Sequence, residues 1–156
     1  MNKKYKFTGE TKNHEGITLY RIQALRSFGN VTKGDLGGWI EKEENLSHGG
    51  TAWVYDDARV YESARVCEEA LVFGNAWVSE YAEVFGRSQV FGKALVCGYA
   101  QVCGAAWVYE NALVDGSARV SRDARVSGYA RVGGSALAIV IFICIVTGKQ
   151  IGRAHV

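Results

Sequence analysis

Apolar residues recur at every sixth position through the middle of the chain. Valine occupies that position fourteen times in succession, from Val54 to Val132, and a small residue stands two places before each valine. An α-helix turns about 100° per residue, so these valines would point in three directions and form no apolar stripe. The Ala-x-Val unit has period two, which a short strand places on one face. The pattern predicts short strands and excludes a helix.

Bend-forming residues separate the predicted strands. Glycine stands two places after the valine in eight hexads, and a charged residue stands there in the other six. Because glycine and short polar residues favour bends, the chain over 51–134 is expected to coil on itself, each coil stacking on the one before. The predicted inward-facing core consists of the repeat valines, Val54, Val60, Val66, Val72, Val78, Val84, Val90, Val96, Val102, Val108, Val114, Val120, Val126 and Val132.

This repeat resembles the hexapeptide-repeat, left-handed parallel β-helix family, in which three hexads make one triangular coil. The resemblance rests on units such as Ala70 with Val72 and covers about half the chain. It departs from the family pattern directly after the aliphatic residue, where Tyr55 or Phe73 replaces a small or acidic one. The variant, and the segment KGDLGGWIEKEENLS, look most like phage and prophage hexapeptide proteins of unassigned role. The resemblance implies an all-β fold, a single-stranded left-handed parallel β-helix (solenoid).

The ends of the chain break the repeat. Residues 1–50 contain KKYKFTG and GITLYRIQAL, two strand-like segments joined by the polar turn TKNHEG, and predict a small N-terminal β-hairpin cap. A partner-recognition module is the alternative for this region. GDLGG at 34–38 lacks the Lys-Ser/Thr of a phosphate loop and is interpreted as a turn. The hexapeptide-repeat β-helix is expected over 51–138.

Residues 139–156 form an atypical apolar tail. Eleven apolar residues run from Ala136 to Val146, fewer than the ~20 needed to span a bilayer, and their β-branched content suits a buried strand. The final IGRAHV can be written ATC GGA AGA GCA CAC GTC, which resembles the start of a common sequencing-library adapter. We therefore expect residues 151–156 to be a sequencing artefact.

Composition narrows the partners and the compartment. The formal net charge of +2 argues for neither nucleic acid nor an anionic membrane as a partner. The four cysteines contain no CxxC pair, and the first residues contain no apolar signal core. We expect a cytoplasmic protein, or a virion-associated one if it is a phage structural protein. Charge is uneven along the repeats: 51–86 holds two Arg against seven acids, whereas 87–134 holds six Lys or Arg against three. That asymmetry indicates a solvated surface, head-to-tail attraction between copies, or contact with an anionic partner.

Candidate catalytic residues are few. Hexapeptide β-helix acyltransferases, which the chain resembles in its coil, typically use a histidine base and a loop that interrupts the repeats. The histidines here are His14, His48 and His155, and none lies within the hexads. His48, one period before Val54, is the weak candidate for a base, and a place at the edge of the cap is its alternative. No metal site is expected, because three converging histidines are not available. Cys67, Cys97 and Cys103 are interpreted as small apolar filler.

One side of the predicted prism is rich in aromatic residues. With three hexads in a coil, residues one coil apart stack in register, and this side then carries Trp53, Tyr55, Leu71, Phe73, Phe91, Trp107 and Tyr109. Stacked rings stabilise such ladders by themselves, but a continuous apolar face also marks an interface. The family resemblance favours a homotrimer. We predict a non-enzymatic structural or binding solenoid without cofactor; the alternative is an acyltransferase that uses an acyl-CoA donor.

Overall fold

The computed structural model describes residues 2–138 and 142–145. Apart from one 3-10 turn, η1 (Glu43–Asn45), the elements in these residues are β-strands, and no helix in the described part is long and apolar enough to cross a membrane. Three longer strands come first, β1 (Tyr5–His14), β2 (Ile17–Ala24) and β3 (Leu36–Ile40). The short strands that follow are β4 (Trp53–Val54), β5 (Arg59–Val60), β6 (Arg65–Val66), β7 (Leu71–Val72), β8 (Trp77–Val78), β9 (Glu83–Val84), β10 (Gln89–Val90), β11 (Leu95–Val96), β12 (Gln101–Val102), β13 (Trp107–Val108), β14 (Leu113–Val114), β15 (Arg119–Val120), β16 (Arg125–Gly128), β17 (Arg131–Val132), β18 (Leu137–Ala138) and β19 (Phe142–Ile145).

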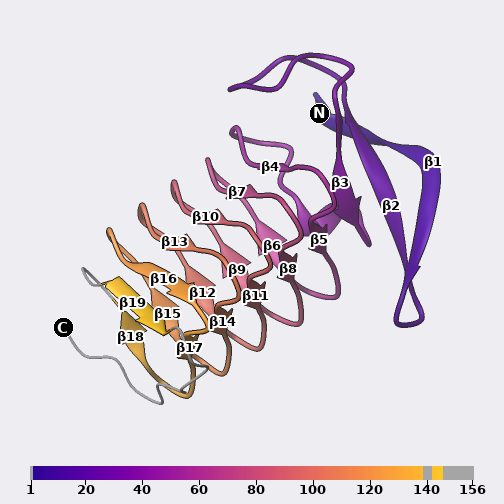
Figure 1. Ribbon diagram of the computed structural model, residues 1–156. Coiled ribbons are helices and arrows are strands. Elements are labelled where there is room, and N and C mark those ends of the chain that lie inside the picture. The colour runs from indigo at the N-terminus through magenta and orange to yellow at the C-terminus, as the bar shows by residue number, and fades with distance from the viewer. Residues whose placement is uncertain (1, 139–141, 146–156) are drawn as a thin grey trace.

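The short strands stack into three parallel sheets, which form the sides of a prism (Figure 1). Face 1 carries β4, β7, β10, β13, β16 and β19; face 2 carries β3, β5, β8, β11, β14 and β17; face 3 carries β6, β9, β12, β15 and β18. Trp53 pairs with Leu71 and Val54 with Val72, a separation of 71 − 53 = 18 residues, which is three hexads. The predicted all-β parallel solenoid with a small N-terminal hairpin is therefore confirmed.

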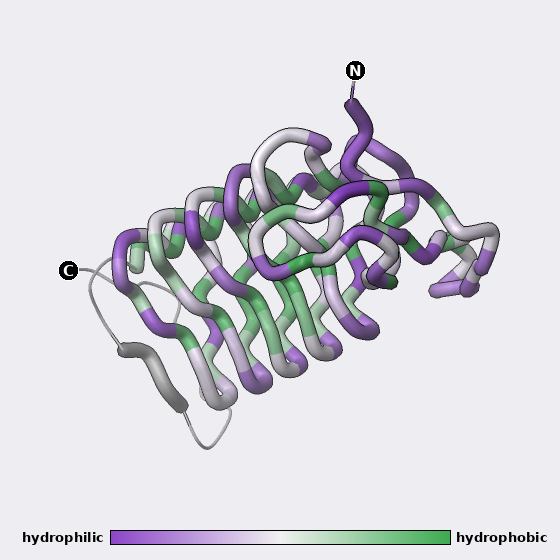
Figure 2. The backbone as a smooth tube through the Cα atoms, turned by 90° about the horizontal axis from the view of Figure 1, so that it is seen from above, coloured by the Kyte–Doolittle hydropathy of each residue, from purple (hydrophilic) through white to green (hydrophobic). Residues whose placement is uncertain are grey.

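The interior is a file of valines and alanines. The valines from Val54 to Val132 are at most 1% exposed, and the alanines that precede them from Ala52 to Ala130 are fully buried. The one exception to alanine, Ser88, is also buried, and its hydroxyl donates to the carbonyl oxygens of Phe85 and Val102. Figure 2 shows the hydrophobic residues along the strands and the hydrophilic ones gathered at the bends and the N-terminal hairpin.

Every bend places one residue in the left-handed region of the backbone. Glycine occupies most of these positions, and the six non-glycine residues there have φ between 55° and 62°. Four of them, Asp56, Glu62, Glu68 and Glu110, use the side chain to accept the backbone N–H one coil further along. For Glu68 the acceptor is Oε2 and the donor is the N–H of Gly86, at 2.7 Å. The acidic residues thus link neighbouring coils at the corners.

Glu68→Ala is expected to lower stability by about 1–2 kcal/mol, because alanine keeps the left-handed strain and loses the carboxylate acceptor. Glu68→Gly also loses the acceptor, but it removes the strain, so we expect a change within about 0.5 kcal/mol of the parent. Urea denaturation of both variants measures the difference. Equal losses of stability would show that left-handed strain contributes nothing at this corner.

The first coil begins within the segment assigned to the cap. Strand β3 pairs in parallel with β5 from Trp39, and Leu46 bridges Val66 in parallel, so parallel pairing of the solenoid ladder is already present before residue 51. Strands β1 and β2 form an antiparallel hairpin, and β2 pairs antiparallel with β3. The repeat signal is lost in this coil because it is built on different residues, not because the coil is absent.

The GDLGG segment is only partly a turn. Residues 33 and 34 are in a turn, but Leu36, Gly37 and Gly38 belong to β3. A Cβ atom on Gly37 would lie 2.7 Å from the Trp53 ring and from the Val54 carbonyl oxygen. The glycines are therefore required by close packing of β3 on the next coil, and the interpretation of the whole segment as a turn is corrected.

The apolar tail adds a strand to face 1. Strand β19 pairs in parallel with β16, with Phe142 opposite Arg125, a separation of 142 − 125 = 17 residues. The last coil is thus one residue shorter than the others, so Ile143, not residue 144, pairs with Val126. Residues 139–141 and 146–156 lie outside the described residues, and so does the proposed sequencing artefact at 151–156.

Candidate functional site

In the first regular coil, formed by β4, β5 and β6, each face has an alanine carbonyl oxygen that needs a hydrogen-bond donor. In the regular ladder the alanine carbonyl accepts an N–H from the coil before, as Ala70 does from Trp53 at 3.1 Å. The corresponding carbonyls of this regular coil belong to Ala52, Ala58 and Ala64, on faces 1, 2 and 3. Strand β3 supplies a backbone donor for face 2 only, from the Trp39 N–H to the Ala58 oxygen at 3.0 Å.

A buried lysine closes face 1. The Lys4 Nζ donates to the Ala52 oxygen at 2.6 Å and to the Gly49 oxygen at 3.4 Å. Lys4 is fully buried, and burial, followed by the nearby charge of Arg26, lowers the pKa of its amine to about 8. The ammonium group replaces the missing strand on this face.

A buried asparagine closes face 3. The Asn45 Nδ2 donates to the Ala64 oxygen at 2.9 Å and to the Glu62 oxygen at 3.1 Å. Its Oδ1 accepts the N–H groups of Lys42 at 2.8 Å and Glu41 at 3.1 Å. All four hydrogen-bonding positions of the amide are used, so this side chain serves as a complete edge cap.

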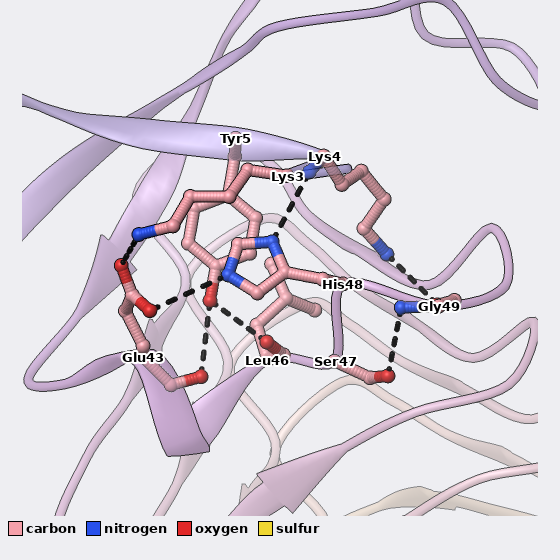
Figure 3. Close-up of polar contacts among 8 residues, drawn as sticks. All are labelled: Lys3, Lys4, Tyr5, Glu43, Leu46, Ser47, His48 and Gly49. Atoms are coloured by element: carbon pink, nitrogen blue, oxygen red, sulfur yellow. Dashed lines mark hydrogen bonds and ion pairs between the residues drawn. The ribbon is translucent and has the colours of Figure 1, made fainter. Parts of the chain in front are cut away.

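His48 clamps the start of β1 (Figure 3). The Lys4 backbone N–H donates to His48 Nδ1 at 3.1 Å, and the ring stacks on Tyr5 with centroids 4.2 Å apart. Because Nδ1 is an acceptor, the proton of the neutral ring lies on Nε2, which faces Glu43 Oε2 at 3.6 Å. The hydrogen bond from Lys3 is the main reason that the pKa of Glu43 lies below its usual value. His48 therefore joins β1 to the turn around η1.

A groove of about 550 Å³ opens beside this clamp on face 3. Its lining includes Cys67, His48 and Glu43, the residue types of a nucleophile, a base and an orienting acid. Two observations argue against that chemistry. The lone pair of His48 is already used by the Lys4 N–H, and burial raises the pKa of the Cys67 thiol, which keeps it protonated.

His14 fastens the far end of the hairpin to face 2. It is 4% exposed; its Nδ1 accepts from Arg59 Nη1, and its Nε2 lies 3.2 Å from the Tyr61 hydroxyl. The Trp77 ring meets the imidazole edge-on at 4.4 Å. Burial, and then the Arg59 charge, lower the pKa of His14 below its usual value. His14 thus packs as a neutral ring, a role that the repeat pattern did not predict because His14 lies outside it.

The hairpin contact is expected to weaken in mild acid. His14 binds its proton less readily in the folded protein than in the unfolded chain, so stability is full above pH 6.5 and falls as the pH drops towards the folded pKa. The charges that face His14 are Arg59 and Lys12, which oppose protonation, and Glu15, which favours it. Thermal melts between pH 7.5 and 5 measure the effect. His14→Gln should show a smaller loss over this range, and an identical pH dependence in the two proteins would contradict the assignment.

The aromatic side of the prism differs from the expected open face. Trp53 is fully buried, with Phe28 packed edge-on against it at 5.2 Å, so it is not available to a partner and its place in the predicted interface is corrected. The other predicted interface residues are only partly exposed: Tyr55, Leu71, Phe73, Phe91, Trp107 and Tyr109. The Phe91 ring stacks on Phe73 at 4.7 Å and on Tyr109 at 5.0 Å. Ring stacking accounts for part of the apolar surface, as the ladder interpretation predicts.

The remaining candidates do not form a site. Within residues 2–138 and 142–145, no three His, Cys, Asp or Glu side chains are placed to hold a metal ion. Cys67, Cys97 and Cys103 are free thiols, and burial raises the pKa of Cys97 to about 11.

The coil geometry and its caps define a parallel β-solenoid of hexapeptide-repeat type. A family model described as YdcK Beta solenoid repeat matches residues 52–68. The chain is similar to the "Uncharacterized acetyltransferase YdcK" of Escherichia coli (strain K12), with 38% identity over 52 residues. That segment is 33% of this chain but only 15% of the relative. Both similarities fit a hexapeptide-repeat β-helix.

Proposed function

We propose that the chain is a non-enzymatic β-solenoid with a structural or binding role. The observation that carries this proposal is the use of His48, the histidine candidate for a base, as a structural clamp between Lys4, Tyr5 and Glu43. The corners support it, because strands follow at six-residue spacing from β4 to β18 with no inserted loop. The proposal includes a phage or prophage origin and a cytoplasmic or virion location, because the repeat resembles that of phage and prophage hexapeptide proteins.

The second candidate is an acetyltransferase, favoured by the printed name of the E. coli relative. A thermal melt with acetyl-CoA and with coenzyme A tests between the two. A solenoid scaffold should melt at the same temperature with and without either compound. An acetyl-CoA site would instead add about 2.7 kcal/mol of stability at a ligand concentration about 100 times its Kd. His48→Asn should lower the melting temperature of the scaffold by loosening β1. Acetyl transfer that is abolished by this variant would establish the enzyme instead.

Self-association through face 1 is part of the proposal, with a homotrimer as the favoured state. Its support is the row of partly exposed apolar residues beyond the cap, from Leu71 to Tyr109. Light scattering should report an oligomer for the native chain and a smaller mass for Phe91→Glu. The matched control Tyr99→Glu changes an exposed ring on another part of the surface. A native monomer would refute the interface, and an oligomer that only the control disrupts would place it elsewhere.

A further inference from the structure

A second groove lies further along face 3, where the charge of the chain turns basic. Its volume is about 400 Å³. The lining residues are Glu68, Phe85, Gly86, Cys103, Gly104, Arg119, Ser121 and Arg122. No residue of the His48 clamp is among them, so the groove is independent of the first one.

Two arginines in this groove have no acidic partner. Arg119 and Arg122 are both exposed, and neither forms a salt bridge with any described residue. By contrast, Arg131 on face 2 pairs with Asp115 at 2.6 Å. The Arg119 guanidinium extends across the groove to within 3.9 Å of the Cys103 sulfur. Glu68 is the acidic residue in the lining, and its carboxylate accepts the Gly86 N–H instead of pairing with either arginine.

The backbone of the corner offers a further donor. At this corner Glu68 is followed, one coil at a time, by Gly86, Gly104 and Arg122, all with positive φ. The Glu68 carboxylate satisfies the Gly86 N–H, but the next position holds a glycine, so no side chain reaches the Gly104 N–H. That N–H has no acceptor among the described residues. One coil earlier, the Glu68 carboxylate on the Gly86 N–H shows how a carboxylate oxygen binds a corner N–H of this kind.

We propose that this groove binds a small organic oxyanion, a carboxylate or a phosphate monoester with a flat apolar group. Guanidinium groups suit both oxyanions because their donors match them in pairs. Arg119, Arg122 and the Gly104 N–H hold the charged oxygens, and the Ser121 hydroxyl donates beside them. The ring of Phe85 and the buried thiol of Cys103 contact the apolar part. This ligand is not required by the scaffold role and adds a binding function to it.

The test is an NMR titration of the full chain with benzoate, phenyl phosphate, inorganic phosphate and the neutral benzyl alcohol. We expect the Gly104 amide signal to shift saturably with benzoate or phenyl phosphate, and the stronger of the two identifies the oxyanion. The Gly116 amide is an internal control, because it too follows a glycine one coil earlier, Gly98, but lies next to Asp115, which pairs with Arg131. Equal shifts at Gly104 and Gly116 would overturn the proposal. Inorganic phosphate or benzyl alcohol binding as tightly would also overturn it.

Arg119→Gln with Arg122→Gln should weaken the binding of that ligand about tenfold or more, since each lost charge-assisted hydrogen bond contributes to affinity. Both side chains are exposed, so the melting temperature should stay unchanged. Arg87→Gln, an exposed arginine outside the groove lining, is the matched control and should leave the affinity as it is. An unchanged affinity in the double variant, or an equal loss in the control, would refute the site.

Discussion

Val90→Asp is expected to cause the largest loss of stability of any single change considered. Val90 is fully buried between Val72 and Val108 in the central file of face 1. A carboxylate there has no partner within the apolar interior, and an unpaired buried charge costs several kcal/mol. With about 2–4 °C per kcal/mol for a chain of this size, the melting temperature should fall by roughly 10 °C or more. Circular dichroism melts measure the change.

The control is the neighbouring residue on the same strand. Gln89 is partly exposed and points away from the core, so Gln89→Asp should change stability by less than about 1 kcal/mol. Similar losses in the two variants would contradict the assignment of Val90 to the inward side of β10 and of Gln89 to its outward side. Because a solenoid unfolds coil by coil in the nearest-neighbour picture, the Val90→Asp melt should also become broader.

Asn45→Ala is expected to have the next largest effect, a loss on the order of 3 kcal/mol, because it leaves buried backbone groups without partners. The amide makes four hydrogen bonds to four backbone groups, and two of those groups are the carbonyls of Ala64 and Glu62 at the open edge of face 3. Hydrogen exchange should show the loss first in the coil that contains β6. Denaturant unfolding gives its magnitude.

Asn75→Ala provides the comparison, since Asn75 is an exposed corner residue whose side chain forms no hydrogen bond with a described residue. It should stay within about 0.5 kcal/mol of the parent. If the two asparagine variants lose equal stability, Asn45 does not act as an edge cap. A loss confined to Asn45→Ala would show that the backbone bridge between Leu46 and Val66 does not close face 3 without this amide.

The repeat was predictable because its physics is local. Each hexad carries the same small-x-valine unit and a bend residue, so strand, bend and inward face follow from spacing alone, and the pairing of Val54 with Val72 confirms the register. The first coil was harder, since Ile40 and Leu46 replace valine and lie 20 residues, not 18, before their partners Val60 and Val66. The 18-residue rule therefore did not predict that β3 lies parallel to β5.

The candidate site shows the same division. The sequence placed His48 near the edge of the cap, but only the fold shows that its Nδ1 accepts the Lys4 N–H, because donor and acceptor are 44 residues apart. The exposure of the aromatic ladder was overestimated for one residue. Trp53 is the first of the aromatic residues on face 1, yet Phe28 and Tyr5 from the N-terminal segment cover it.

The sequence by itself determined the repeating part of this protein: strands every six residues, three to a coil, around a file of valine and alanine. Those features depend on contacts between equivalent positions, which a periodic sequence specifies without further information. The tertiary structure decided how the file is closed, with a hairpin on face 2, Lys4 on face 1 and Asn45 on face 3. The end of a solenoid has no preceding coil, so its open carbonyl groups take whatever donor the chain brings back from a distance, and no period in the sequence records that choice.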